Sequence, residues 1–302
     1  MKEKDSILIP ETLAIKAPDK KLLELVNNKK FNDKILYEKN SAFHNIKVVE
    51  NEVGRFLHYK DTYQAGFIDT AFYKGNLPYI NYFLIPYLIN PEIKKILIIG
   101  LGTGKLVSDF NKLFKTLKKI DVVDIEENSL EIAKNYFGFV EPENFRFYLQ
   151  DGIVFLKQNK SKYDLIITDV ANNDGIDGRF LTAEYLKEIK KSLKKNGIFV
   201  SNLCSSAEFD NPGNKFLPSI LKKYLSVFKN VNLYKGNYSD KVYYKSFFDI
   251  EERVIDITNL IIISSDKYNA SAIKISVNKN QILAFNELRI DIENYINDIH
   301  IL

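Results

Sequence analysis

The chain has 302 residues, of which 45% are hydrophobic and 27% charged, the composition of an ordinary globular protein. Its 43 basic and 39 acidic residues leave a net charge of only +4, and the lysine pairs are scattered, so we expect no nucleic-acid partner. One cysteine excludes an intrachain disulfide, and three widely spaced histidines show no metal-ligand spacing, so we expect no metal.

Two further observations bear on location. The N-terminal stretch carries acids, and its apolar segment is too short for a signal peptide. The apolar run over 82–89 is interrupted by Pro86 and is too short to span a bilayer. We therefore expect a cytoplasmic protein that does not enter a membrane.

The first 75 residues divide into two parts. Residues 1–40 are rich in lysine and are predicted to form an N-terminal arm. Within 41–75, apolar and polar residues alternate over 44–50, 55–59 and 63–68, with turn residues between them, which predicts a small antiparallel β-domain. Residues 76–302 are predicted to form the main domain, which begins with a helix over 77–88.

From residue 95 onward, predicted strands and helices alternate, which favours an α/β fold with a mostly parallel, doubly wound sheet and helices on both faces. The predicted strands are 95–99, 120–123, 145–149, 163–168, 197–203, 230–235 and 259–264. The predicted helices are 105–117, 128–137, 152–159, 180–194, 214–228 and 279–298.

A glycine turn joins the first of these strands to the first helix. Gly100, Gly102 and Gly104 follow the apolar strand, and the next strand ends in Asp124. This is how α/β folds build a nucleotide site, with an acid about 20 residues on for the ribose hydroxyls. Lys105 stands where a dinucleotide fingerprint has its third glycine, which favours S-adenosylmethionine or a relative. The alternative is a tight turn in which the glycines serve packing alone.

Polar residues recur where the predicted parallel strands end, and ligands bind at that edge of such sheets. Asp124 would accept from the ribose hydroxyls, or else it complements a helix N-terminus together with Glu126 and Glu127. Asp151 would accept from an adenine amino group, or else it caps the helix over 152–159. Asp169 would hold or deprotonate an amine nucleophile, or else it is a turn residue.

The loop over 170–179 contains two glycines and several polar residues. Its position after Asp169 suits a lid over the substrate, and a plain connection is the alternative. Asn202 closes the series of polar residues at strand ends.

With these residues in view, the chain resembles the spermidine and spermine synthases, the polyamine aminopropyltransferases, and is most similar to divergent bacterial members. The resemblance runs from about residue 44 to residue 265. It implies a methyltransferase-like, Rossmann-like α/β domain after an N-terminal β-domain. It also implies transfer of an aminopropyl group from decarboxylated S-adenosylmethionine to a diamine, with release of methylthioadenosine. We expect the chain to form a homodimer or tetramer.

The resemblance assigns roles residue by residue. Asp169 matches the amine-activating aspartate, and Tyr79 a tyrosine that faces the site. In the loop, Asn172 and Asp174 fall at the substrate gate. The residues that match the nucleoside site are Gln64, Gly100, Gly102, Thr103, Gly104, Asp124, Ile125, Asp151 and Gly152.

Three positions depart from the pattern of the synthases. Thr103 and Asn172 stand where they carry aspartate, and Asn81 stands where they carry glutamate. The nucleoside half of the site is therefore kept and the amine half is reduced. Two alternatives follow: an S-adenosylmethionine-dependent methyltransferase, and a nucleoside-binding protein without turnover.

Overall fold

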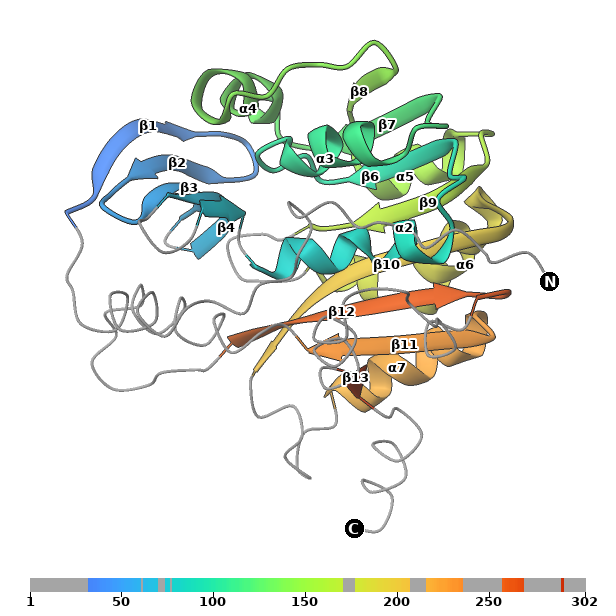
Figure 1. Cartoon of the computed structure of the whole chain (residues 1–302). Helices are drawn as coiled ribbons and strands as arrows, with labels where there is room; N and C mark the ends of the chain where they lie inside the picture. The colour runs from blue at the N-terminus through green and yellow to red at the C-terminus, as the bar shows by residue number, and fades with distance from the viewer. Residues whose placement is uncertain are drawn as a thin grey trace.

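The computed structural model describes residues 32–60, 62–69, 74–76, 78–170, 177–206, 216–235, 257–268 and 289–290. These residues form two β-sheets that lie side by side (Figure 1). The N-terminal sheet is antiparallel and has the strand order β1-β2-β3-β4-β5. Its strands are β1 (Lys34–Asn40), β2 (Asn45–Glu50), β3 (Gly54–Tyr59), β4 (Thr62–Asp69) and β5 (Lys74–Asn76).

The three strands predicted from alternation are confirmed as β2, β3 and β4. Strands β1 and β5 were not predicted, and β1 lies in the residues assigned to the arm, so the sheet begins earlier than expected. The side chains of β1 are mostly exposed, which gives the strand no apolar alternation to recognise. The division into an arm and two domains stays a prediction.

The second sheet has eight strands in the order β13-β11-β12-β10-β9-β6-β7-β8. Five neighbouring strands are parallel to one another, namely β10, β9, β6, β7 and β8, which confirms the mostly parallel sheet. The other three pair antiparallel at one edge. The strands are β6 (Lys95–Ile99), β7 (Lys119–Asp124), β8 (Phe145–Leu149), β9 (Tyr163–Thr168), β10 (Leu193–Ser206), β11 (Asn230–Lys235), β12 (Ile257–Ser265) and β13 (Arg289–Ile290).

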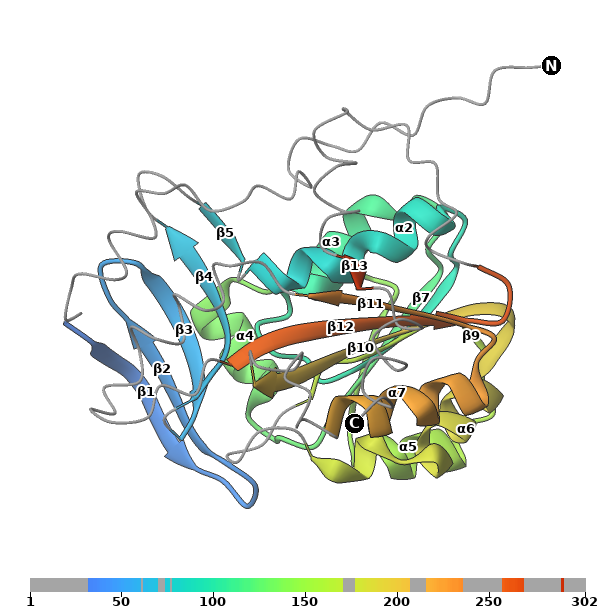
Figure 2. The same ribbon diagram turned by 90° about the horizontal axis from the view of Figure 1, so that it is seen from below.

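Helices cover both faces of this sheet (Figure 2). On one face lie the 3-10 helix η2 (Pro78–Leu84), α2 (Ile85–Ile89), α3 (Lys105–Leu113) and α4 (Ser129–Phe137). On the other face lie α5 (Gly152–Gln158), α6 (Ala183–Ser192) and α7 (Phe216–Val227).

Alternation along the central strands produces the two apolar cores. In β6, Ile96 and Ile98 face the α3 side, whereas Leu97 and Ile99 face the α5 side, and all four are buried. A third, smaller core lies between the N-terminal sheet and α4. The glycine turn is thus fixed at the end of a strand that is packed on both faces.

Three helix predictions need correction. The helix predicted over 77–88 is largely the 3-10 helix η2, because Pro86 has no N–H to donate to the preceding turn of an α-helix. The helix predicted over 180–194 begins as the 3-10 turn η3 (Gly178–Leu181), and α6 follows after Thr182, whose hydroxyl caps it. Residues 289–290 form β13 within the helix predicted over 279–298, and the rest of that segment lies outside the described residues.

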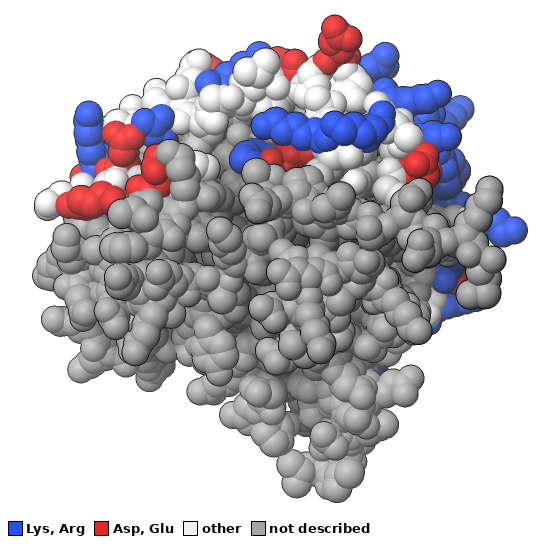
Figure 3. All heavy atoms as spheres, viewed as in Figure 1, with Lys and Arg blue, Asp and Glu red and all other residues white. Residues whose placement is uncertain are grey.

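On the face drawn in Figure 3, the basic and acidic side chains of the described residues are intermixed, and basic groups gather at its right-hand edge. No helix in the described part of the chain is both long and apolar enough to span a bilayer.

Candidate active site

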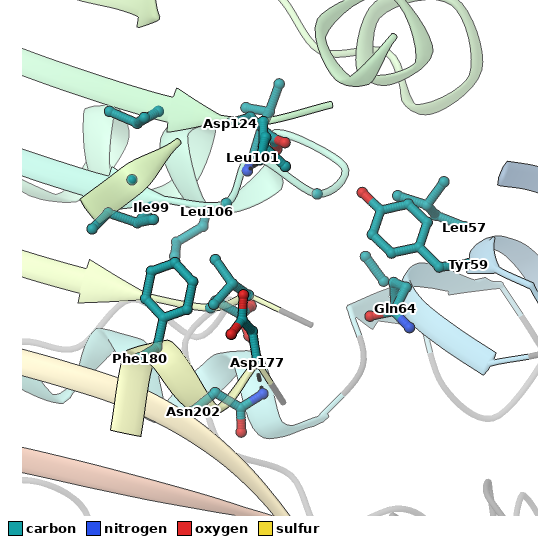
Figure 4. A pocket seen from close by; sticks show the side chains of 18 of the residues that line it. Leu57, Tyr59, Gln64, Ile99, Leu101, Leu106, Asp124, Asp177, Phe180 and Asn202 are labelled. Atoms are coloured by element: carbon teal, nitrogen blue, oxygen red, sulfur yellow. Dashed lines mark hydrogen bonds between the residues drawn. The ribbon is translucent and has the colours of Figure 1, made fainter. Parts of the chain in front are cut away.

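A pocket of about 380 Å³ lies at the carboxyl edge of the parallel strands, between them and the N-terminal sheet. It lies beside the point where the strand order reverses, since β7 follows β6 on one side and β9 flanks β6 on the other. Ligands bind at such switch points in open α/β sheets. Figure 4 shows Tyr59 and Gln64 on one side of the pocket, across from Asp124, Leu101 and Asn202.

The surroundings of the glycine turn require glycine at two of its positions. Gly100 has φ +98°, and a Cβ there would lie 2.2 Å from the carbonyl oxygen of Asp169. Only glycine therefore allows the ends of β6 and β9 to approach this closely. A Cβ on Gly104 would lie 2.6 Å from the Phe139 ring, and Gly104 does not line the pocket. Packing thus explains Gly104, whereas Gly100 and Gly102 line the pocket.

Asp124 lies at the end of β7, where two backbone donors fix its carboxylate. The N–H of Leu101 donates to Oδ2 at 2.8 Å, and the N–H of Glu126 donates to Oδ1 at 2.9 Å. Burial raises the pKa of Asp124, and these two hydrogen bonds oppose that effect. The acid is thus held in one orientation at the pocket wall, with acceptor capacity left on both oxygens.

Glu126 turns away from the pocket into a buried network between the two sheets. Its carboxylate accepts from Ser41 Oγ at 2.5 Å and from Asn128 Nδ2 at 2.6 Å, and it pairs with His44 Nδ1 at 3.1 Å. Burial alone would raise the pKa of Glu126, but these hydrogen bonds outweigh it and lower the pKa to about 2. The His44 ring stacks on Tyr59 at 3.9 Å and lines the pocket. Glu126 therefore joins the sheets, and Asp124 is the acid of the pair that faces the ligand space.

Asp151 caps α5, as its alternative interpretation predicted. Its Oδ1 accepts from the N–H groups of Ile153 and Val154 at 2.8 and 3.0 Å. Its Oδ2 lies 2.9 Å from Nη1 of Arg179. Both residues line the pocket, so the cap also presents a charged pair to it.

Asp169 follows β9 and is partly buried in the pocket wall. The side-chain amide of Asn202 donates to its Oδ1 at 3.0 Å. The Tyr79 hydroxyl lies 3.5 Å from its Oδ2 and 3.1 Å from the carbonyl oxygen of Gln64, which is the nearer acceptor for its single proton. Burial raises the pKa of Asp169 to about 6, although both groups favour the ionised form. Near neutral pH the group is mostly ionised, with a proton affinity that suits a general base.

Most of the predicted site residues come together in this one pocket. Those that line it are Gln64, Tyr79, Gly100, Gly102, Thr103, Asp124, Ile125, Asp151, Gly152 and Asp169. Asn172 and Asp174 lie outside the described residues. Among the described residues, no group of three His, Cys, Asp or Glu side chains is placed to hold a metal ion.

Several residues at the site had no predicted role. Asn202 was recognised as a polar strand end, but its hydrogen bond to Asp169 was not predicted. His44 and Tyr59 lie in segments whose local patterns carry no signal for this pocket. Arg179 ends the loop over 170–179, for which a lid over the substrate is predicted, but its side chain had no predicted role of its own.

These features define a Rossmann-like α/β protein with an antiparallel N-terminal sheet and a pocket at the switch point of its main sheet. Residues 83–244, more than half of the chain, match the family described as the spermine/spermidine synthase domain. The chain belongs to this family, as the resemblance predicted.

Relatives and solved structures agree with this assignment. A polyamine aminopropyltransferase from Clostridium botulinum is 30% identical over 174 residues, which cover 56% of this chain and 59% of the relative. One from Vibrio vulnificus is 32% identical over 184 residues, covering 58% and 60%. The match thus spans about 60% of the relatives' length. A crystal structure of spermidine synthase in complex with the transition-state analogue AdoDATO has a TM-score of 0.66 at 18% identity, covering 87% of this chain and 88% of that one, and shows the shared fold.

Proposed function

We propose that the protein is a polyamine aminopropyltransferase that uses decarboxylated S-adenosylmethionine as donor and a diamine as acceptor. The observation that carries this proposal is the Asp169 carboxylate, held by the Asn202 amide near the Tyr79 hydroxyl, in the same pocket as Asp124. Asp169, a proton acceptor, and Asp124, an acid placed to bind ribose hydroxyls, thus lie at the ends of β9 and β7, the two strands that flank β6.

The proposed reaction is a displacement at carbon. The acceptor nitrogen attacks the methylene carbon next to the sulfonium, a C–N bond forms, and the C–S bond breaks. Its electron pair passes to sulfur, which leaves as the neutral thioether of methylthioadenosine, and Asp169 takes the proton from nitrogen. Because the sulfonium is already a good leaving group, positioning and proton removal are the contributions that the chain must make.

Strand order suggests how the donor lies. Asp151 follows β8, Asp124 ends β7, and Asp169 follows β9 beyond β6. A ribose held by Asp124 would direct the adenine toward Asp151 and the sulfonium toward Asp169. A pocket of about 380 Å³ falls within the usual range for sites of small molecules.

Methyl transfer from S-adenosylmethionine is the second candidate, and one observation favours it. Thr103 and Lys105 both line the pocket beside the glycine turn. Thr103 cannot pair with the amine of a decarboxylated donor as a carboxylate would, and the Lys105 ammonium is already paired with Asp109 on α3. The role proposed for Asn172 and Asp174, contact with the acceptor amine, applies to either candidate.

Product analysis separates the candidates. The full chain is incubated with decarboxylated or intact S-adenosylmethionine and a panel of diamines, and products are identified by mass spectrometry. Methylthioadenosine together with an amine extended by an aminopropyl group supports the proposal. S-adenosylhomocysteine supports methyl transfer, and nucleoside binding without any product supports a protein without turnover. Asp169→Asn should abolish product formation while nucleoside affinity stays nearly unchanged.

We further propose a cytoplasmic homodimer or tetramer that works on small amines, without nucleic acid, membrane or a bound metal. Sedimentation of the purified chain, with and without methylthioadenosine, would measure the oligomeric state. Activity that survives dialysis against a chelator would agree with metal-independent transfer.

A further inference from the structure

Arg179 joins two carboxylates at the β8 end of the pocket. Its Nη1 lies 2.9 Å from Asp151 Oδ2, and its Nη2 and Nε lie 2.6 and 2.8 Å from Asp177 Oδ2. The backbone N–H of Arg179 also donates to Asp177 Oδ1, at 2.9 Å. Its guanidinium carbon lies 5.9 Å from the centre of the buried Phe180 ring. The head of the side chain is therefore held on two sides, although 57% of the side chain is exposed.

These contacts leave hydrogen-bonding capacity on residues that line the pocket. A guanidinium has five N–H groups, and the contacts with Asp151 and Asp177 use three of them. Asp151 Oδ1 is occupied by the helix cap, whereas Oδ2 accepts from Arg179 and keeps further acceptor capacity. An acceptor and a charged donor thus lie next to each other among the residues that line the pocket.

A 6-aminopurine offers the complementary pattern. Its exocyclic amino group is a donor, and the ring nitrogens that flank it are acceptors. A base whose ribose is held by Asp124 would lie on the side of β8, where Asp151 and Arg179 are found.

We propose that Arg179 is a base-binding residue that, together with Asp151, selects a 6-aminopurine. Asp151 Oδ2 accepts from the amino group, and Arg179 donates to the ring nitrogen beside it, N1 or N7. This inference rests on the nucleoside site of the proposed function and names the residue that sets its base specificity.

Calorimetric titration of the full chain tests the assignment. Methylthioadenosine is compared with its 1-deaza and 7-deaza analogues, each of which lacks one of the two ring acceptors. The wild type should bind one analogue about tenfold more weakly than the parent, the usual loss for a hydrogen bond to a charged group. In Arg179→Ala, affinity for the parent should fall about tenfold, and the ratio between parent and that analogue should collapse to near one.

Matched variants keep the result interpretable. Arg146 is an exposed arginine on β8 that does not line the pocket, so Arg146→Ala should keep the wild-type affinities and ratio. If Arg179→Ala shows no thermal unfolding transition and is therefore not folded, the titrations are repeated with Arg179→Met, which keeps an apolar side chain without hydrogen-bond donors.

Three results would overturn the assignment. First, the ratio of the affinities for the parent and the analogue could stay at its wild-type value in both Arg179 variants. Arg179 would then only pair with Asp151 and Asp177 and would not contact the base. Tighter binding by Arg179→Ala would mean that the guanidinium competes with the base for Asp151. A wild-type chain that binds no nucleoside would refute the proposed function itself, whereas an unchanged ratio would refute only the role of Arg179.

Discussion

Replacing Asp169 by asparagine should make the protein more stable while removing its activity. Burial raises the pKa of this carboxyl from 3.8 to about 6, so the ionised form is disfavoured in the folded state. One pKa unit corresponds to about 1.4 kcal/mol, which gives an upper bound of about 3 kcal/mol for the cost of ionising Asp169 in place. Because the carboxyl is only partly buried, we expect about 1–2 kcal/mol.

The pH dependence identifies the cause of this gain. Between pH 4 and 6 the folded state still holds a proton that the unfolded chain has released, so Asp169 lowers wild-type stability as pH rises through this window. Asp169→Asn should match the wild type near pH 4 and exceed it by about 1–2 kcal/mol above pH 7, as measured by urea unfolding. The wild-type rate should fall as pH drops below about 6, because the base becomes protonated.

Equal stability of the two proteins at pH 8 would refute this reasoning about burial. A variant that gains stability equally at pH 4 and pH 8 would show that repacking, and not the charge, is responsible.

Three further predictions concern the surrounding residues. Asp124→Ala should weaken methylthioadenosine binding at least tenfold in calorimetry, since a charged acceptor for the ribose is lost; unchanged affinity would contradict the ribose role. Gly100→Ala should lower the free energy of unfolding by more than about 2 kcal/mol in thermal unfolding, because the new Cβ would meet the Asp169 carbonyl. Gly138→Ala is the control: this glycine has φ +66° and nothing within 4 Å of its Cβ position, so the loss should be about 1–2 kcal/mol. Glu126→Gln should lower stability at pH 7 by about 2 kcal/mol, since the lowered pKa stabilises the fold above pH 4.5, and this loss should shrink as pH falls toward about 2; a loss independent of pH would exclude the charge as its cause.

Local patterns were sufficient to predict the parallel strands and the residues at their ends. Gly100, Asp124 and Asp169 each follow a short apolar run, and strands of a parallel sheet bring such ends to one edge whatever else the chain does. The same reasoning left each acid with two interpretations, because a cap and a ligand-binding acid look alike in sequence. The structure shows that Asp151 is a cap and also lines the pocket.

Long-range pairing decided the rest. The antiparallel pairing of β11 and β12 and the bridge from Arg179 to Asp151 depend on partners far away in the sequence. Hydrophobic periodicity reports which face of an element is buried, but not which neighbour buries it. The sequence by itself therefore determined the type of fold and the edge at which a ligand would bind, whereas the tertiary structure decided which side chains complete that edge, since hydrogen bonds and ion pairs form only where distant segments meet.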